Sequence, residues 1–64
     1  DAETADEVAK LEALTRADIE LSEEALSLAF SADDLEGATG IVTRLKYLLK
    51  LLKEIRRKRL VLNN

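Results

Sequence analysis

The sequence is marked first by the residue types that it lacks. Its 64 residues include no cysteine, histidine, proline, methionine or tryptophan, and only two glycines. Without cysteine or histidine it has no disulfide, no thiol or imidazole for catalysis, and none of the ligands that zinc prefers. Without proline, and with so little glycine, it has few residues that end a helix. We therefore expect a helical chain that is not an enzyme and holds no metal or other cofactor.

The residues that are present favour the same fold class. Alanine, leucine, glutamate, lysine and arginine dominate the chain, and these residue types lose least on entering a helix. No apolar run approaches the ~20 residues that a membrane span needs. A chain of this length forms at most one small domain, which buries only about 60% of its unfolded surface. Regular helix packing, or association with another chain, must therefore support the core.

Two capping motifs divide the chain. Thr4 and Glu7 match the capping box, in which the hydroxyl accepts from a backbone N–H and the glutamate reaches back. Asp33 and Glu36 repeat the pattern with a carboxylate as the cap. Each motif marks the start of a helix, so the sequence predicts two helices.

The predicted helices cover about residues 5–30 and 34–59, joined by residues 31–33. A connection this short makes the two helices antiparallel neighbours. A competing cap at Ser31 would move the boundary by two residues and leave the topology unchanged. Residues 1–64 are thus expected to form a single domain, an all-α antiparallel hairpin.

Charge is divided sharply between the two halves. Residues 1–36 carry twelve acidic side chains against Lys10 and Arg16, whereas residues 37–64 carry eight basic side chains against Glu54. In an antiparallel hairpin the two ends of opposite charge lie side by side: Asp1, Glu3, Asp6 and Glu7 beside Arg56, Arg57, Lys58 and Arg59. An exposed ion pair contributes only ~0 to 1 kcal/mol. The pattern therefore selects the orientation of the helices more than it stabilises them.

Both predicted helices are apolar over a wider arc than one neighbour can cover. The main stripe of the first helix contains Val8, Leu11, Ile19, Leu26 and Phe30, and Leu14, Ala17, Leu21, Ala25 and Leu28 continue it round a further side. The main stripe of the second contains Leu35, Ala38, Val42, Leu45, Leu49 and Leu52, flanked by Ile41, Leu48 and Ile55. We therefore expect the hairpin to be part of a three-helix bundle whose first helix is missing or supplied by another copy. We also expect the isolated hairpin to self-associate.

Other local patterns have structural explanations. Gly37 and Gly40 suggest a phosphate loop, but the strand and the lysine of such loops are absent, and the glycines fit the first turns of a helix. The basic amphipathic segment 46–62 is typical of helices that bind anionic membranes or nucleic acid. A core-facing leucine stripe with a solvated basic edge explains it better, because the acidic first helix offers a charge complement. We expect no nucleic-acid or membrane partner.

Tyr47 is the residue that the helical wheel places outside the core. Its direction lies beyond the leucine stripe, near Gly40, Thr43 and Leu51. An exposed tyrosine can be incidental, but tyrosine is enriched among binding hot spots because it joins a rigid apolar body to a polar tip. Both interpretations stay open on the pattern alone.

The segment from Phe30 to Leu48 resembles the C-terminal domain of the HscB-type J-protein co-chaperones. In that family an aromatic residue closes one helix, an acidic turn follows, and the next helix carries a stretch matched here by Ile41 to Tyr47. The resemblance implies a three-helix bundle that binds the iron–sulfur cluster scaffold protein. It also implies a separate J-domain, whose His-Pro-Asp loop stimulates a partner ATPase chaperone.

Carried over to this chain, the family's contact residues map onto Tyr47 alone, as a scaffold-binding aromatic. The chain has no histidine or proline, so contact with the ATPase chaperone requires a J-domain outside it. Because the sequence starts with Asp1 and lacks an initiator methionine, we expect a fragment of a longer protein. The resemblance implies that it starts after the domain's first helix. The basic ending, residues 56–64, resembles the mitochondrial members, which implies the mitochondrial matrix; the bacterial cytoplasm is the alternative. The alternative function is a helical oligomerisation or protein-interaction hairpin with no chaperone role.

Overall fold

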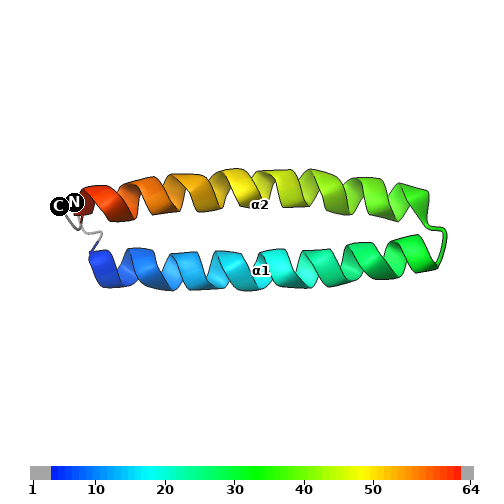
Figure 1. Ribbon diagram of the computed structural model, residues 1–64, viewed down its shortest axis with the longest axis horizontal. Coiled ribbons are helices and arrows are strands. Elements are labelled where there is room, and N and C mark those ends of the chain that lie inside the picture. The colour runs from blue at the N-terminus through cyan, green and yellow to red at the C-terminus, as the bar shows by residue number, and fades with distance from the viewer. Residues whose placement is uncertain (1–3, 63–64) are drawn as a thin grey trace.

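The protein is a hairpin of two long helices. The computed structural model describes residues 4–62, in which α1 covers Ala5–Ser31 and α2 covers Leu35–Leu62. The helices lie side by side and antiparallel, with the turn at one end of the molecule (Figure 1). The molecule extends 46 × 16 × 14 Å, as expected for paired helices of 27 and 28 residues. The predicted all-α antiparallel hairpin is thus confirmed.

The start of α1 carries the predicted cap. Thr4 is extended, with φ −111° and ψ 165°, and its Oγ1 accepts from the backbone N–H of Glu7 at 3.2 Å. The same hydroxyl donates to Oε1 of Glu7, also at 3.2 Å. Glu7 therefore interacts with the Thr4 side chain through both its backbone and its carboxylate. The carboxylate also places a negative charge at the helix N-terminus, where the helix dipole favours it.

The turn between the helices is a Schellman motif built around an aspartate. The N–H of Asp34 donates to the carbonyl oxygen of Ala29 at 2.8 Å, and the N–H of Asp33 donates to that of Phe30 at 3.1 Å. Asp33 takes the left-handed conformation, with φ 57°, at the position that glycine usually fills. Ser31 ends α1, so the alternative cap at Ser31 is wrong.

Asp34 is the cap of α2. Its Oδ1 accepts from the backbone N–H of Gly37 at 2.9 Å, so the cap lies one residue later than the predicted Asp33. The reason is that Asp33 adopts the left-handed conformation of the turn, so the next residue takes the cap position. Gly37 has a local role here, because a Cβ on it would collide with the carboxylate of Asp34.

The two helices meet along a seam with the 3–4 spacing of a coiled coil. The buried side chains of α1 are Val8, Glu12, Thr15, Ile19, Ser22 and Ala29, and those of α2 are Ala38, Leu48, Leu52 and Ile55. At its centre, Ile19, Leu48 and Leu52 form a cluster against which Leu45 packs. The core is therefore a narrow strip between two helices, with polar residues at three of its α1 positions.

The predicted core was right in part. Val8, Ile19, Ala38 and Leu52 are buried as expected, but four residues of the predicted stripes are exposed: Leu11, Phe30, Leu35 and Leu49. Leu48 and Ile55, placed on the flank by the sequence, belong to the core instead. The apolar arc of α2 is so wide that the helix could pack against α1 at several rotations about its own axis. Arg59 follows Leu52 and Ile55 at the same 3–4 spacing. The rotation that α2 adopts therefore places Arg59 against Glu12 of α1.

Candidate functional site

The candidate site is centred on Tyr47, near the middle of α2. The side chain is 63% exposed, which agrees with its predicted direction outside the core. Beside it, Lys50, Leu51 and Glu54 complete a shallow hollow on the surface of α2. Tyr47 therefore presents an apolar ring and a hydroxyl to a partner without supporting the seam between the helices. Its role in binding stays a prediction.

The hollow at Tyr47 continues toward α1. A second apolar hollow is lined by Leu11 of α1 and by residues of α2 that include Leu51, Ile55 and Val61. Leu51 and Glu54 belong to both hollows, so Tyr47 and Leu11 lie on the same side of the hairpin. The site thus spans both helices.

Further leucines extend this surface along α1. Leu14, Leu21 and Leu28 follow Leu11 at helical spacing and are 67%, 63% and 71% exposed. We call the set comprising Leu11, Leu14, Leu21, Leu28, Tyr47 and Leu51 the leucine face. Exposed apolar surface of this extent on so small a chain is typical of an interaction site.

A charged pair crosses the leucine face. Asp18 lies between Leu14 and Leu21 on α1, and its Oδ2 is 3.8 Å from a guanidinium nitrogen of Arg44 on α2. Both side chains are more than half exposed, so the pair is screened by solvent and stabilises the hairpin little. The pair places one acidic and one basic group among the exposed leucines.

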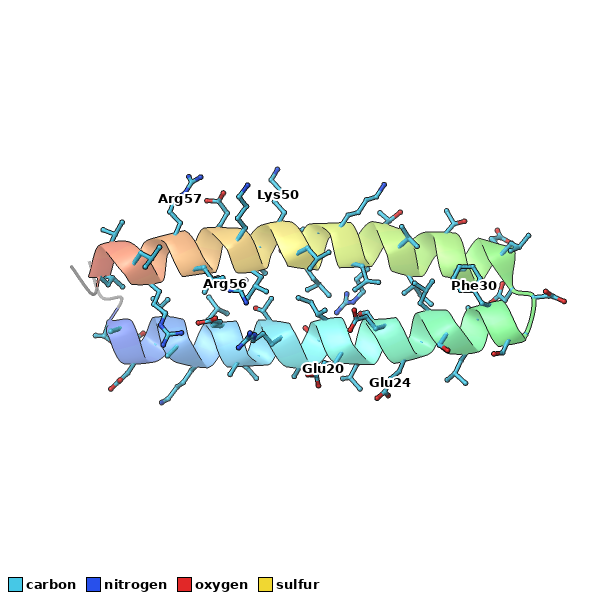
Figure 2. The ribbon with its side chains drawn as sticks, in the orientation of Figure 1. Glu20, Glu24, Phe30, Lys50, Arg56 and Arg57 are labelled. Carbon is cyan, nitrogen blue, oxygen red and sulfur yellow. The ribbon has the colours of Figure 1, made fainter. Side chains whose placement is uncertain are left out.

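Glu12 forms a second, buried charge cluster at the open end of the hairpin. Only 7% of this residue is exposed, and its carboxylate pairs with Arg59 and with Nε of Arg56 at 3.5 Å. Figure 2 shows Arg56 directed from α2 toward α1. The hydrogen bond from Arg59 is the main cause that lowers the pKa of the Glu12 carboxyl, while burial opposes it and Arg56 and Arg16 add to it.

Sequence reasoning missed Glu12. It paired the basic end of α2 with acids nearer the start of the chain, of which Asp1 and Glu3 lie outside the described residues. The signal was available, because Glu12 stands four residues after Val8 and seven before Ile19, at seam positions. The predicted orientation still holds, since the acid comes from α1 and the bases from α2.

Other charged side chains lie on the two outer edges. Figure 2 shows Glu20 and Glu24 projecting from α1 away from α2, and Lys50 and Arg57 projecting from α2 away from α1. Within α1 seven side chains are acidic and two basic, and within α2 eight are basic and two acidic. The hairpin thus has an acidic edge and a basic edge, with the leucine face between them.

Residues 4–62 contain no group of three or more acidic or sulfur or imidazole side chains that could hold a metal ion. Neither of the described helices combines the length and the apolar run that crossing a membrane requires.

Comparison with protein families identifies the class. Residues 1–56 match the family described as the HSCB C-terminal oligomerisation domain. The chain belongs to this family, as the stretch from Phe30 to Leu48 predicted. Comparisons with curated proteins and with solved structures gave no match. Membership supports a co-chaperone role in iron–sulfur cluster assembly in general, and protein partners with it.

Proposed function

We propose that the chain binds the iron–sulfur cluster scaffold protein and that Tyr47 is the central contact. The observation that carries the proposal is the position of Tyr47. It is a largely exposed aromatic on an apolar surface shared by both helices, in a chain that belongs to a co-chaperone family. Tyrosine is enriched among binding hot spots because it joins a rigid apolar ring to a polar tip.

The proposal separates binding from folding. Tyr47 lies outside the seam, so its truncation should leave the helices packed. Truncating a central interface aromatic commonly costs ~2 kcal/mol or more, which is about a thirtyfold loss of affinity. Tyr47→Ala should therefore weaken binding to the scaffold by about that factor and leave the thermal unfolding curve nearly unchanged.

The test is a calorimetric titration of the chain against the scaffold protein, with circular dichroism melts of each variant. Leu49→Ala is the matched control, because Leu49 is also an exposed large residue of α2 but lies outside the leucine face. Unchanged affinity in a folded Tyr47→Ala chain would remove Tyr47 from the site. Equal losses for Tyr47→Ala and Leu49→Ala would show a general effect on the helix.

We further propose that delivery to the partner ATPase chaperone depends on a J-domain outside this chain, and that the protein acts in the mitochondrial matrix. The support is the absence of histidine and proline from the chain and its basic ending, residues 56–64. The isolated chain should leave the ATPase rate of that chaperone unchanged. Fractionation of cells expressing the tagged natural protein tests the location, and recovery outside mitochondria would contradict it.

The second candidate function is self-assembly through the hairpin without a chaperone role. It is favoured by the family's description as an oligomerisation domain and by the exposed leucines of α1. The two functions differ in one measurement, because only the first predicts binding to the scaffold protein.

A further inference from the structure

We infer that α2 carries a peripheral membrane-binding surface, which lies on an anionic bilayer with its lysines among the lipid headgroups and its leucines at the boundary with the acyl chains. We call this surface the basic stripe, and its members are Lys46, Leu49, Lys50, Lys53, Arg57 and Leu60. It shares no residue with the leucine face, so the inference does not rest on the proposed function.

The first step is that the members of the basic stripe share one side of α2. They follow one another at steps of three or four residues, with Leu49 and Lys50 at the same step, so they lie within an arc of roughly 100°. Lys50 and Arg57 project from α2 away from α1 (Figure 2). Lys50 also lines the hollow at Tyr47, and it therefore marks the border between the basic stripe and the leucine face.

The second step is that the lysines of the stripe have no acidic partner. Within residues 4–62, none of Lys46, Lys50 and Lys53 forms an ion pair, whereas Arg57 pairs with Glu54 at 3.9 Å. Lys46 and Lys50 stand four residues apart, as do Lys53 and Arg57, and like charges at this spacing destabilise a helix. Nothing within the hairpin offsets that effect. A row of this kind is typical of a surface that attracts an external anion.

The third step is that the acids near the stripe stand at its borders. On α2, Glu54 lies toward the hollows of the leucine face, and Glu36 lies in the first turn, before the stripe begins. On α1, Phe30 lines a hollow at the start of the stripe, so Glu23, one heptad earlier, lies on that side of the hairpin. Arg16 precedes Glu23 by a further heptad and offsets its charge. The stripe itself has four cations and no acid.

The fourth step is that exposed leucines alternate with the cations. The sequence argued against a membrane partner because the leucines of segment 46–62 were expected to face the core. Leu49 and Leu60 are instead 54% and 72% exposed, so that argument does not hold for this stripe. Leucines between lysines can enter the boundary between headgroups and acyl chains, while the long lysine side chains reach the lipid phosphates.

The same features select a bilayer over other polyanions. Nucleic acid offers no acyl layer to Leu49 and Leu60, and the stripe has no aromatic side chain to stack on bases. Protein interfaces usually seat aromatic or arginine anchors in hollows, whereas three of the four cations here are lysines on the outer side of one helix. A flat anionic surface needs only cations and aliphatic side chains along one line.

The first experiment is flotation of the full chain with vesicles of phosphatidylcholine, with and without phosphatidylserine. Binding should require phosphatidylserine and weaken as salt is added. Lys46→Gln with Lys53→Gln should lower the partition coefficient about 25-fold, since each cation contributes about fivefold.

The matched control is Lys10→Gln with Lys58→Gln, which removes the same charge. Lys58 lines a hollow of the leucine face, and Lys10 lies one turn before Leu14 of that face. This variant should bind vesicles much as the wild type does, and circular dichroism establishes that both variants are folded. A chain that does not bind phosphatidylserine vesicles, or equal losses for the two double variants, overturns the inference.

A second pair of variants tests the apolar contribution. Leu49→Ala should lower vesicle binding about fivefold, because it removes an inserted side chain. Tyr47→Ala is the control, since Tyr47 is also exposed on α2 but lies outside the stripe, and it should bind vesicles like the wild type. Normal binding by Leu49→Ala, or an equal loss for Tyr47→Ala, overturns the insertion of the stripe.

A single tryptophan reports which side of the hairpin meets the bilayer. The chain has no tryptophan, so Leu60→Trp and Leu21→Trp each introduce one, at exposed positions of the basic stripe and of the leucine face. Phosphatidylserine vesicles should shift the emission of Leu60→Trp to the blue and protect it from acrylamide, and should leave that of Leu21→Trp unchanged. Equal shifts, or a shift for Leu21→Trp alone, overturn the orientation.

Competition at physiological salt separates the bilayer from other anions. Polyglutamate represents an acidic protein segment, and a duplex oligonucleotide represents nucleic acid. Neither should displace the chain from phosphatidylserine vesicles at a matched concentration of charge, because neither offers an apolar layer to the leucines. Displacement by either one would assign the stripe to that kind of partner and overturn the inference.

Discussion

Leu48 and Leu49 are neighbours in α2 with opposite environments, and replacing each by alanine tests the assignment of the core. Leu48 is 4% exposed and packs with Ile19 and Leu52, whereas Leu49 is 54% exposed. Both changes remove the same atoms from the same helix, and the difference in helix propensity is the same for both. Any difference in stability between the two variants therefore reports the burial of the side chain.

The size of the expected loss in unfolding free energy for Leu48→Ala depends on the thickness of the seam. A buried leucine truncated to alanine loses ~2–5 kcal/mol, and the lower end applies where neighbours can relax into the space. A seam only two helices thick allows such relaxation, so we expect Leu48→Ala to cost about 2–3 kcal/mol. A domain of this size rarely has more than ~3–5 kcal/mol in total, so Leu48→Ala should be partly unfolded at room temperature. Leu49→Ala should change stability by less than about 0.5 kcal/mol.

The assay is urea unfolding followed by far-ultraviolet circular dichroism, at concentrations low enough to keep association from adding to stability. Equal losses for the two variants would show that α2 does not use Leu48 as its core residue. A larger loss for Leu49→Ala would restore the stripe predicted from the sequence and refute the seam described above.

Three further predictions concern local features. Because Arg59 and Arg56 hold the pKa of Glu12 below its ordinary value, its stabilising contribution is complete above the unfolded-state pKa of about 4.3 and is lost as the pH falls through the folded-state pKa. Glu12→Gln should therefore show a shallower loss of stability in acid, measured by thermal melts at a series of pH values, and parallel curves would contradict the coupling. Asp33→Gly should raise the unfolding free energy by about 0.5–1 kcal/mol by relieving the left-handed residue, and a loss in chemical denaturation would refute this. Gly40→Ala should stabilise by up to ~1 kcal/mol, whereas Gly37→Ala should gain less because its Cβ meets the capping Asp34; equal gains in the same assay would show that this contact relaxes freely.

The fold was predictable from sequence because its determinants are local. The Thr4 cap, the acidic turn and the opposite charges of the two halves each act over a few residues or over whole helices. The turn was harder to predict, because glycine usually marks a helix that ends in a left-handed residue. Here Asp33 occupies that left-handed position. The boundary consequently moved by one residue while the topology stayed as predicted.

The seam was less predictable because hydrophobicity does not say which neighbour a residue faces. α1 has two stripes at coiled-coil spacing, and the one that α2 covers contains Glu12, Thr15 and Ser22. A buried carboxylate is tolerated there only because Arg56 and Arg59 reach it from the other helix. That contact depends on how the two helices rotate about their own axes, which neither helix determines alone.

The same limit applies to the candidate site. The wheel of one helix was enough to predict that Tyr47 lies outside the core. Its continuity with Leu11 through Leu51 could not be predicted, because it needs the relative rotation of both helices. The scaffold-binding role of Tyr47 stays a prediction that the titration above addresses.

The position of the turn has a mechanical consequence. Thr4 and Leu62, the first and last described residues, lie at the same end of the rod, opposite the turn (Figure 1). A force applied between these ends peels the helices apart from the open end, one layer of the seam after another, instead of sliding all layers at once. The layer of Val8 separates early, followed by Glu12 with its arginines, and the cluster of Ile19 yields only afterwards. The hairpin should therefore open under low force, and the pairs of Glu12 with Arg56 and Arg59 should set the first resistance that a pulling experiment detects.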